Sequence, residues 1–201
     1  MRARPVGEPR GRARGRACGI ACGMVILLAL LVAPDAAWPG QDDSPLDGLF
    51  QRLRVTADAV DANELEARIW RIWLRFSDAR VNDLMAGGIR RMDGGHLAEA
   101  RDVFTQITRL APKFAEGWNK LATVDYLLRD FGASAHGIAR TLALEPRHFG
   151  ALSGLGLVNM ALDRPARALK SFRQALKIHP HMPGVRRNIK QLQKRLKDEE
   201  I

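Results

Sequence analysis

Apolar residues recur at intervals of three and four along most of the chain, which is the spacing of one face of an α-helix. The pattern is clear at Leu65, Ile69, Ile72 and Phe76, and it returns over residues 185–196. Short segments rich in Gly, Pro and Asp separate these stripes and are typical of turns. The pattern therefore predicts an all-α protein built from short amphipathic helices.

A longer period underlies the helical pattern, because Pro112, Pro146 and Pro180 are each 34 residues apart. Proline disrupts a helix interior, so these positions fit the boundary between one pair of helices and the next. Aligning the chain at this period gives three full repeats without insertions, residues 81–114, 115–148 and 149–182.

Aligned positions in the three repeats hold side chains of matching size. The small position of the first helix holds Gly88, Ala122 and Gly156. The small position of the second helix holds Ala100, Ser134 and Ala168. The bulky position four residues later holds Phe104, Ile138 and Phe172. Small residues let two antiparallel helices approach closely, and a bulky residue fills the gap between successive pairs.

These columns resemble the tetratricopeptide repeat (TPR), whose pattern is W-x2-L-G-x2-Y, then A-x3-F, then P. The resemblance covers residues 81–182, and Trp118 stands in the family's Trp column. One column departs from the family, because its Tyr is replaced by Arg91, Asp125 and Asn159. The resemblance implies a right-handed solenoid of antiparallel helix pairs that binds other proteins, without catalytic activity or cofactor.

The segments on either side of the repeats are predicted to cap the solenoid. Residues 47–80 are interpreted as a degenerate N-terminal helix pair, with its second helix capped at Asp61 or Asn63. Trp70 and Trp73 in that helix either cover the end of the stack or form a binding hot spot. Residues 183–201 are interpreted as a capping helix and tail, whose basic outer face is either a solvated surface or a site for acidic partners or lipid headgroups.

The N-terminal segment, residues 1–40, differs in character from the rest of the chain. Six arginines come before an apolar run at residues 17–33, the order found in a signal peptide. We expect export, most simply to the periplasm, and the alternative is inner-membrane anchoring by an uncleaved leader through residues 17–33. Residues 41–46 are interpreted as a linker. Both cysteines, Cys18 and Cys22, lie in the leader, which leaves the folded part without a disulfide framework.

The remaining chemistry gives no support for catalysis. His179 and His181 are the closest pair of histidines, but no cysteine or acidic residue accompanies them in sequence, so no metal site is expected. No phosphate loop, zinc-protease or serine-hydrolase motif occurs. The net charge of +10 permits an acidic partner, but the aromatic residues fall mostly in packing columns, so nucleic acid is not expected as a partner.

The family resemblance implies that the first helix of each repeat lines a concave, partner-binding face. The residues placed there are Met85, Ile89, Met92, Asn119, Thr123, Tyr126, Ser153, Leu157 and Met160. Members that bind a C-terminal carboxylate use Lys, Arg and Asn on this face, and here Gly150 and Gly154 occupy two of the matching positions. We therefore expect an apolar or amphipathic partner segment.

The predicted function is that of a small exported bacterial TPR protein, a protein–protein interaction scaffold or assembly factor of the cell envelope. The alternative is a membrane-anchored adaptor or chaperone-like module that holds client polypeptides. An enzyme would need a convergent polar cluster, which the sequence does not offer. The oligomeric state stays open.

Overall fold

The computed structural model of the chain describes residues 44–199, and the side chains of residues 45–198. The predicted leader, residues 1–40, lies outside the described residues, as do residues 41–43 of the predicted linker and the last two residues of the tail. Residues 44–46, also assigned to the linker, instead form the start of a helix, in which Leu46 is buried. Within the described part, no helix is both long enough and apolar enough to cross a membrane.

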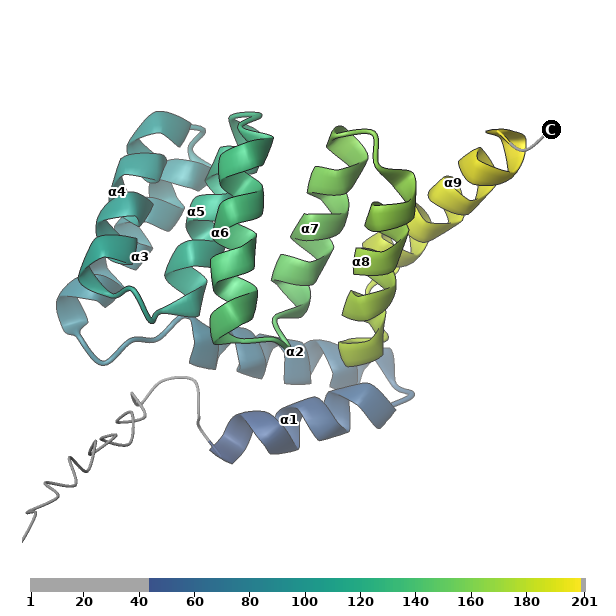
Figure 1. The fold of residues 1–201 in the computed structure, drawn as a ribbon. Coiled ribbons are helices and arrows are strands. Elements are labelled where there is room, and N and C mark those ends of the chain that lie inside the picture. The colour runs from purple at the N-terminus through teal and green to yellow at the C-terminus, as the bar shows by residue number, and fades with distance from the viewer. Residues whose placement is uncertain (1–43, 200–201) are drawn as a thin grey trace, which may run out of the picture. The chain divides into compact units, whose positions relative to one another are not determined.

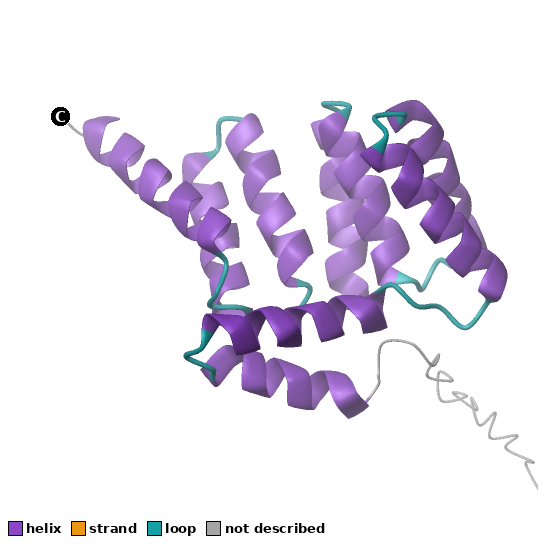
Figure 2. Cartoon of the chain, turned by 180° about the vertical axis from the view of Figure 1, so that it is seen from behind, coloured by secondary structure: helices purple, strands orange, loops and turns teal. Residues whose placement is uncertain are grey.

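The described residues form nine α-helices joined by short turns, and no strand occurs among them (Figures 1 and 2). The helices are α1 (Ser44–Val55), α2 (Ala59–Trp73), α3 (Ala79–Asp93), α4 (Leu97–Leu110), α5 (Ala115–Leu127), α6 (Phe131–Leu144), α7 (Phe149–Ala161), α8 (Pro165–Ile178) and α9 (Pro183–Glu199). Three antiparallel pairs, α3–α4, α5–α6 and α7–α8, stand side by side, one for each sequence repeat (Figure 1). The predicted all-α solenoid is confirmed.

The size-matched columns explain how each pair packs. A methyl group added at Gly156 would lie 2.3 Å from Cε1 of Phe172, and one added at Gly88 would lie 2.6 Å from Cε1 of Phe104. The phenylalanine ring of the second helix therefore rests directly on the backbone of the first. In the middle repeat the first helix has Ala122 in place of glycine, and the second helix has Ile138 in place of phenylalanine. The larger side chain on one helix is matched by the smaller one on the other, so these two helices also pack closely.

The turn within each helix pair repeats one backbone conformation. Gly95, Arg129 and Asp163 occupy equivalent repeat positions, and their φ angles are 78°, 63° and 54°. Only glycine adopts this left-handed conformation without steric cost. Arg129 and Asp163 do not favour this conformation by themselves, so the packing of the helix pairs imposes it on the turn.

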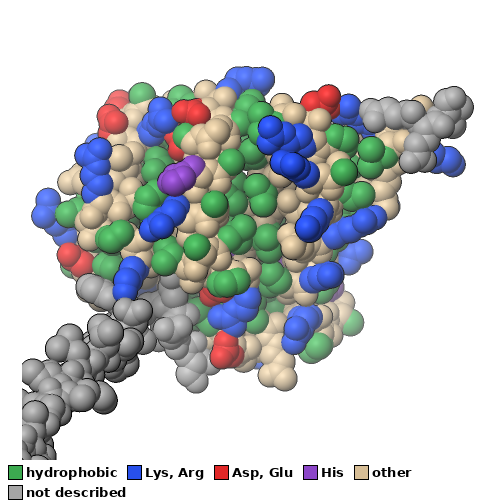
Figure 3. All heavy atoms as spheres, in the orientation of Figure 1, with side chains coloured by type: hydrophobic (Ala, Val, Ile, Leu, Met, Phe, Trp, Pro, Cys, Tyr) green, Lys and Arg blue, Asp and Glu red, His purple; other side chains and the backbone are tan. Residues whose placement is uncertain are grey.

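The last helix, α9, covers the C-terminal end of the stack. Val185 and Leu192 are buried against Ala168 and Phe172 of α8. Lys and Arg side chains lie on the outward faces of α8 and α9, and several are visible on the right of Figure 3.

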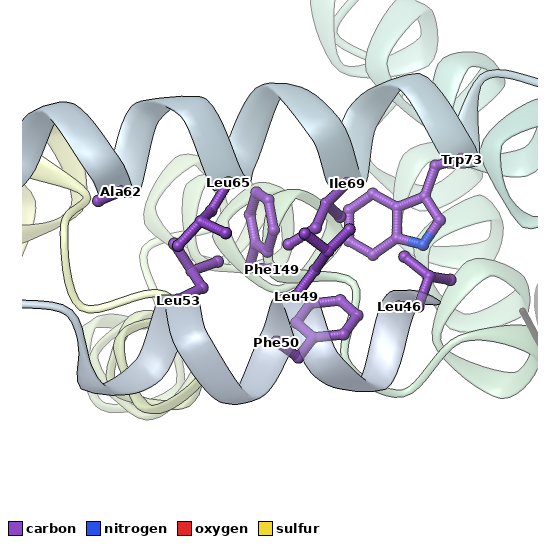
Figure 4. Close-up of a cluster of buried hydrophobic side chains, with 9 residues drawn as sticks. All are labelled: Leu46, Leu49, Phe50, Leu53, Ala62, Leu65, Ile69, Trp73 and Phe149. Atoms are coloured by element: carbon purple, nitrogen blue, oxygen red, sulfur yellow. The ribbon is translucent and has the colours of Figure 1, made fainter. Parts of the chain in front are cut away.

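Helices α1 and α2 form a pair, but this pair does not lie at the N-terminal end of the stack (Figure 1). It runs across the lower edge of the helix pairs and packs on the second and third repeats (Figures 1 and 2). Figure 4 shows the cluster between these two helices, which Phe149 of α7 joins. The segment between α2 and α3 packs against the core of the first repeat instead. There the ring centroid of Phe76 lies 5.0 Å from that of Phe114.

The start of α2 also differs from the sequence-based prediction. The helix begins earlier than expected, and its cap is Asp58, whose carboxylate accepts a hydrogen bond from the backbone N–H of Val60 at 2.7 Å. Asp61, which was one of the two predicted caps, instead forms an ion pair with Arg52 at 3.1 Å. The shift is consistent with the short turn after α1, which ends at Asp58, a residue type strongly preferred at the N-cap.

Candidate functional site

A cavity of about 240 Å³ opens between the first helices of the second and third repeats. We call it the α5–α7 cavity. Helix α6 contributes to its wall, and α2 closes one end. Its lining residues are Glu66, Trp70, Asn119, Ala122, Thr123, Tyr126, Ser134, Ile138, Phe149, Gly150, Ser153, Gly154, Leu157 and Met182.

Five of the nine residues predicted to bind a partner line this cavity. They are Asn119, Thr123, Tyr126, Ser153 and Leu157. Repeat register alone brought these residues together, because equivalent positions of successive first helices face the same side of a solenoid.

The other four predicted residues lie elsewhere. Met85 is only 2 % exposed and belongs to the core of the first repeat. Ile89 and Met92 are half-buried against the same core, into which Leu74 also packs. Met160 packs against the α8–α9 core and lines a separate small hollow. The apolar surface expected from the methionines is therefore mostly used for packing within the chain.

The sequence did not reveal the contribution of α2 to the cavity. Trp70 lies so close to α7 that a methyl group added at Gly150 would lie 2.8 Å from the ring. The absence of a side chain at Gly150 leaves room for the indole ring of Trp70. The sequence held a signal for this contact, a glycine where the family often has a larger residue, but it did not identify the neighbour. Trp70 therefore both joins α2 to the solenoid and lines the cavity.

A buried polar network supports the cavity from beneath. Glu116 is fully buried, and its carboxylate lies 2.9 Å from Nε2 of His148 and 3.2 Å from Nζ of Lys120. The backbone N–H of Ala151 donates to Nδ1 of His148 at 3.0 Å, so the ring proton sits on Nε2 and is donated to Glu116. Asn119 donates to the same carboxylate at 3.1 Å. The network fixes α5 against the start of α7.

A second histidine–carboxylate pair holds α2 at the end of the cavity. The carboxylate of Glu66 lies 3.0 Å from Nε2 of His179 and accepts a hydrogen bond from the indole N–H of Trp70 at 3.1 Å. The hydrogen bond with His179 is the largest influence on the pKa of Glu66 and lowers it; burial acts in the opposite direction. Both carboxylate oxygens are thus engaged in positioning, so Glu66 holds the orientation of Trp70.

The two histidines of the close sequence pair have separate partners. His179 faces Glu66, whereas His181 bonds the backbone oxygen of Thr56 at 2.9 Å. Within residues 44–199, no group of three or more His, Cys, Asp or Glu side chains is arranged to hold a metal ion.

The polar groups of the cavity are few, and most already form hydrogen bonds within the protein. Thr123 donates to the backbone oxygen of Asn119 at 2.9 Å, and Ser134 donates to that of Ala122 at 2.8 Å. Trp70, Phe149, Leu157 and other apolar side chains make up most of the remaining wall. This arrangement can accept an apolar side chain.

Comparison with known proteins agrees with a fold of repeated helix pairs. A family model described as tetratricopeptide repeat matches residues 119–183. The chain belongs to the tetratricopeptide-repeat family. A TPR repeat-containing protein of Rhizobium etli is 30% identical over 135 residues, which cover 67% of this chain and 66% of that relative. The TPR fold is in general an interaction module, and the comparisons indicate no catalytic family.

Solved TPR structures share the fold at low sequence identity. MamA protein superposes with a TM-score of 0.56 at 20% identity, over 77% of this chain and 84% of that one. The first TPR of RPAP3, solved with an HSP90 peptide, gives 0.57 at 20% identity, over 59% and 95%. The Yersinia enterocolitica secretion chaperone SycD, solved with a peptide of the translocator YopD, gives 0.56 at 11% identity, over 59% and 96%.

Proposed function

We propose that this TPR protein is a non-catalytic interaction scaffold or assembly factor of the bacterial cell envelope, and that it binds a partner segment in the α5–α7 cavity. One observation carries the proposal. An apolar cavity opens on the first helices of adjacent repeats, and a tryptophan from outside the repeats closes one end of it. The walls are held by buried hydrogen bonds, so the site is formed before a partner arrives.

The size of the cavity suits one large apolar side chain of a peptide. Its 240 Å³ is large enough to hold several water molecules. Displacing such water from an apolar wall favours binding. The RPAP3 and SycD structures contain bound peptides, which supports a peptide ligand for this related fold.

A carboxylate terminus is not the ligand that we propose. Gly150 and Gly154 offer no cationic side chain to the cavity, and Lys120 is engaged by Glu116 at 3.2 Å. An internal apolar or amphipathic segment fits the wall better, with Tyr126 and the remaining donor of Asn119 at hand for its backbone.

The second candidate is a membrane-anchored adaptor or chaperone-like module. It is favoured by the apolar run at residues 17–33, which comes before the fold in sequence. In that case the cavity would accept many unfolded segments weakly instead of one defined partner.

The test fills the cavity without disturbing the fold. At Gly154 an added Cβ meets only Cδ1 of Ile138, at 3.5 Å, so Gly154→Leu should be accommodated and should occupy the cavity. Gly48→Leu is the matched control, because nothing lies within 4 Å of a Cβ there. Tagged full-length chains are captured from native cells after crosslinking, with circular dichroism as the check of folding.

We expect one stable envelope partner with the wild type and the control, and its loss with Gly154→Leu. Retention of the partner by folded Gly154→Leu would rule out the cavity as the binding site. A diffuse set of clients, or an intact leader on the captured chain, would favour the adaptor; a mature N-terminus near residue 38 or 41 would favour export.

A further inference from the structure

The positive charge of the chain is concentrated in its last two described helices. The segment from residue 164 to residue 197 contains eleven Lys or Arg residues and no Asp or Glu. The other 21 basic residues and all 22 acidic residues lie elsewhere in the sequence, so this segment alone accounts for the net charge of +10. Such separation of charge creates a local field that attracts anions.

The structure places every one of these cations at the surface. The exposed residues are Arg164, Arg167, Lys170, Arg173, Lys177, Arg186, Arg187, Lys190, Lys194, Arg195 and Lys197. The apolar residues of the same two helices pack inward against each other, so the outward faces of α8 and α9 are cationic. Arg195 pairs with Asp163 at 2.7 Å, just outside the segment. We call this surface the α8–α9 basic face.

An exposed apolar tip lies beside the α8–α9 basic face. Val55 is 74 % exposed and Val60 is 66 % exposed, both at the turn between α1 and α2. His181, in the loop between α8 and α9, bonds the backbone oxygen of Thr56 in that turn at 2.9 Å. Arg54 and Lys177 also line one shared hollow. The valine tip and the basic face therefore meet at one end of the described fold.

The basic face and the exposed valines together indicate which kind of anionic partner fits this surface. Single-stranded nucleic acid requires aromatic platforms for its bases, and Phe172, the one aromatic residue of the segment, is fully buried. Two isolated valines form too small an apolar patch for the core of a stable protein interface. An anionic lipid surface satisfies both features, because its headgroups attract Lys and Arg while its interface accepts small apolar side chains.

We propose that the α8–α9 basic face, with the Val55–Val60 tip, docks on an anionic lipid bilayer. This interaction is independent of the α5–α7 cavity, because none of the residues that line the cavity belongs to the basic face or the valine tip. Each Lys or Arg near an anionic surface strengthens binding by about fivefold, and salt weakens the effect within a Debye length.

The test uses full-length protein and two kinds of vesicle, phosphatidylcholine alone and phosphatidylcholine with phosphatidylglycerol. The measured quantity is the ratio of the partition coefficients for anionic and neutral vesicles. This ratio cancels any contribution of the apolar leader that does not depend on lipid charge. The variant is Arg187→Gln with Lys190→Gln and Lys194→Gln, and the matched control is Arg80→Gln with Arg90→Gln and Arg109→Gln, which removes equal charge from exposed positions on α3 and α4.

We expect a ratio well above one for the wild type, a fall of about tenfold to a hundredfold for the α9 variant, and a small change for the control. A Val55→Trp variant should show a blue-shifted emission on anionic vesicles and quenching by brominated lipid. Equal losses in the two triple variants, or a wild-type ratio near one, would overturn the proposal. So would saturable binding of polyglutamate or duplex DNA without any preference for anionic vesicles.

Discussion

His148 lies flat against Trp73, with ring centroids 4.0 Å apart and ring planes 8° from parallel. Its Nε2–H is donated to Glu116, so a single fully buried side chain joins α2, α5 and the start of α7. Removing the carboxylate would leave three donors, from His148, Asn119 and Lys120, without their acceptor.

Glu116→Ala is therefore expected to lower the free energy of unfolding by about 3 kcal/mol or more, because breaking a buried ion pair leaves polar groups unsatisfied. The matched control is Glu99→Ala on exposed α4, where the carboxylate pairs with Arg91 at 3.4 Å, and the expected change is below about 1 kcal/mol. Urea denaturation followed by circular dichroism measures both. Similar losses for the two variants would contradict the structural role of the network.

Two carboxylates should give opposite contributions to acid stability. The hydrogen bond with His179 lowers the pKa of Glu66 below 4.5, whereas burial raises the pKa of Asp125 above 3.8 despite the neighbouring Arg101. A lowered carboxyl pKa adds stability that is present above the unfolded value and lost as pH falls through the folded value. A raised carboxyl pKa does the reverse, so acid relieves a destabilisation.

We expect Glu66→Gln to make the loss of stability below about pH 4.5 shallower than in the wild type, and Asp125→Asn to make it steeper. The measurement is the urea midpoint as a function of pH. A shift of both variants in the same direction would show that these two pKa changes do not act as assigned.

The effects of substitutions at Gly156 and Phe172 on the free energy of unfolding should be coupled, because the two residues are in direct contact in the third repeat. Gly156→Ala introduces a methyl group 2.3 Å from the Phe172 ring, so we expect a loss of about 1–3 kcal/mol from overpacking. Adding Phe172→Ile should recover part of that loss, because the second repeat already combines Ala122 with Ile138. A double-mutant cycle by denaturation checks this expectation, with a coupling of about 1 kcal/mol or more. Additive losses would be the contrary result.

The left-handed turn at Gly95 gives a test of backbone conformation alone. A Cβ at Gly95 or at Gly48 would meet nothing within 4 Å, but only Gly95 has a positive φ, 78°. Gly95→Ala should lose about 1 kcal/mol of stability, whereas Gly48→Ala in α1 should gain about 0.5–1 kcal/mol. Thermal or urea unfolding measures both changes, and a gain at Gly95 would contradict the assigned turn.

The repeats could be predicted from sequence because their packing is local. The partners Gly156 and Phe172 are sixteen residues apart, and their spacing recurs in each repeat. Repeat register likewise brought Asn119, Tyr126 and Ser153 to one cavity. The same reasoning misplaced Met85, which is buried in the core of the first repeat. Leu74 and Phe76, from the segment between α2 and α3, pack against that core.

The position of α2 could not be predicted in this way. Its apolar stripe showed which side would be buried, but no periodic signal identifies His179 as the partner of Glu66, 113 positions away. From sequence, Trp70 was therefore interpreted as an end cap or a binding hot spot. Its contact with Gly150 became apparent only in the structure.

The α1–α2 brace changes how this repeat protein should unfold. An ordinary solenoid is linear, and each repeat depends only on its neighbours, so ends fray independently. Here Glu66 and Thr56 bond to His179 and His181 of the third repeat, 113 and 125 residues away, and Trp73 stacks on His148 at the end of the second. The helix pair α1–α2 therefore links the second and third repeats to each other. Those repeats should open together with α1 and α2 as one cooperative unit, while the first repeat exchanges its amide hydrogens earlier, like a free end.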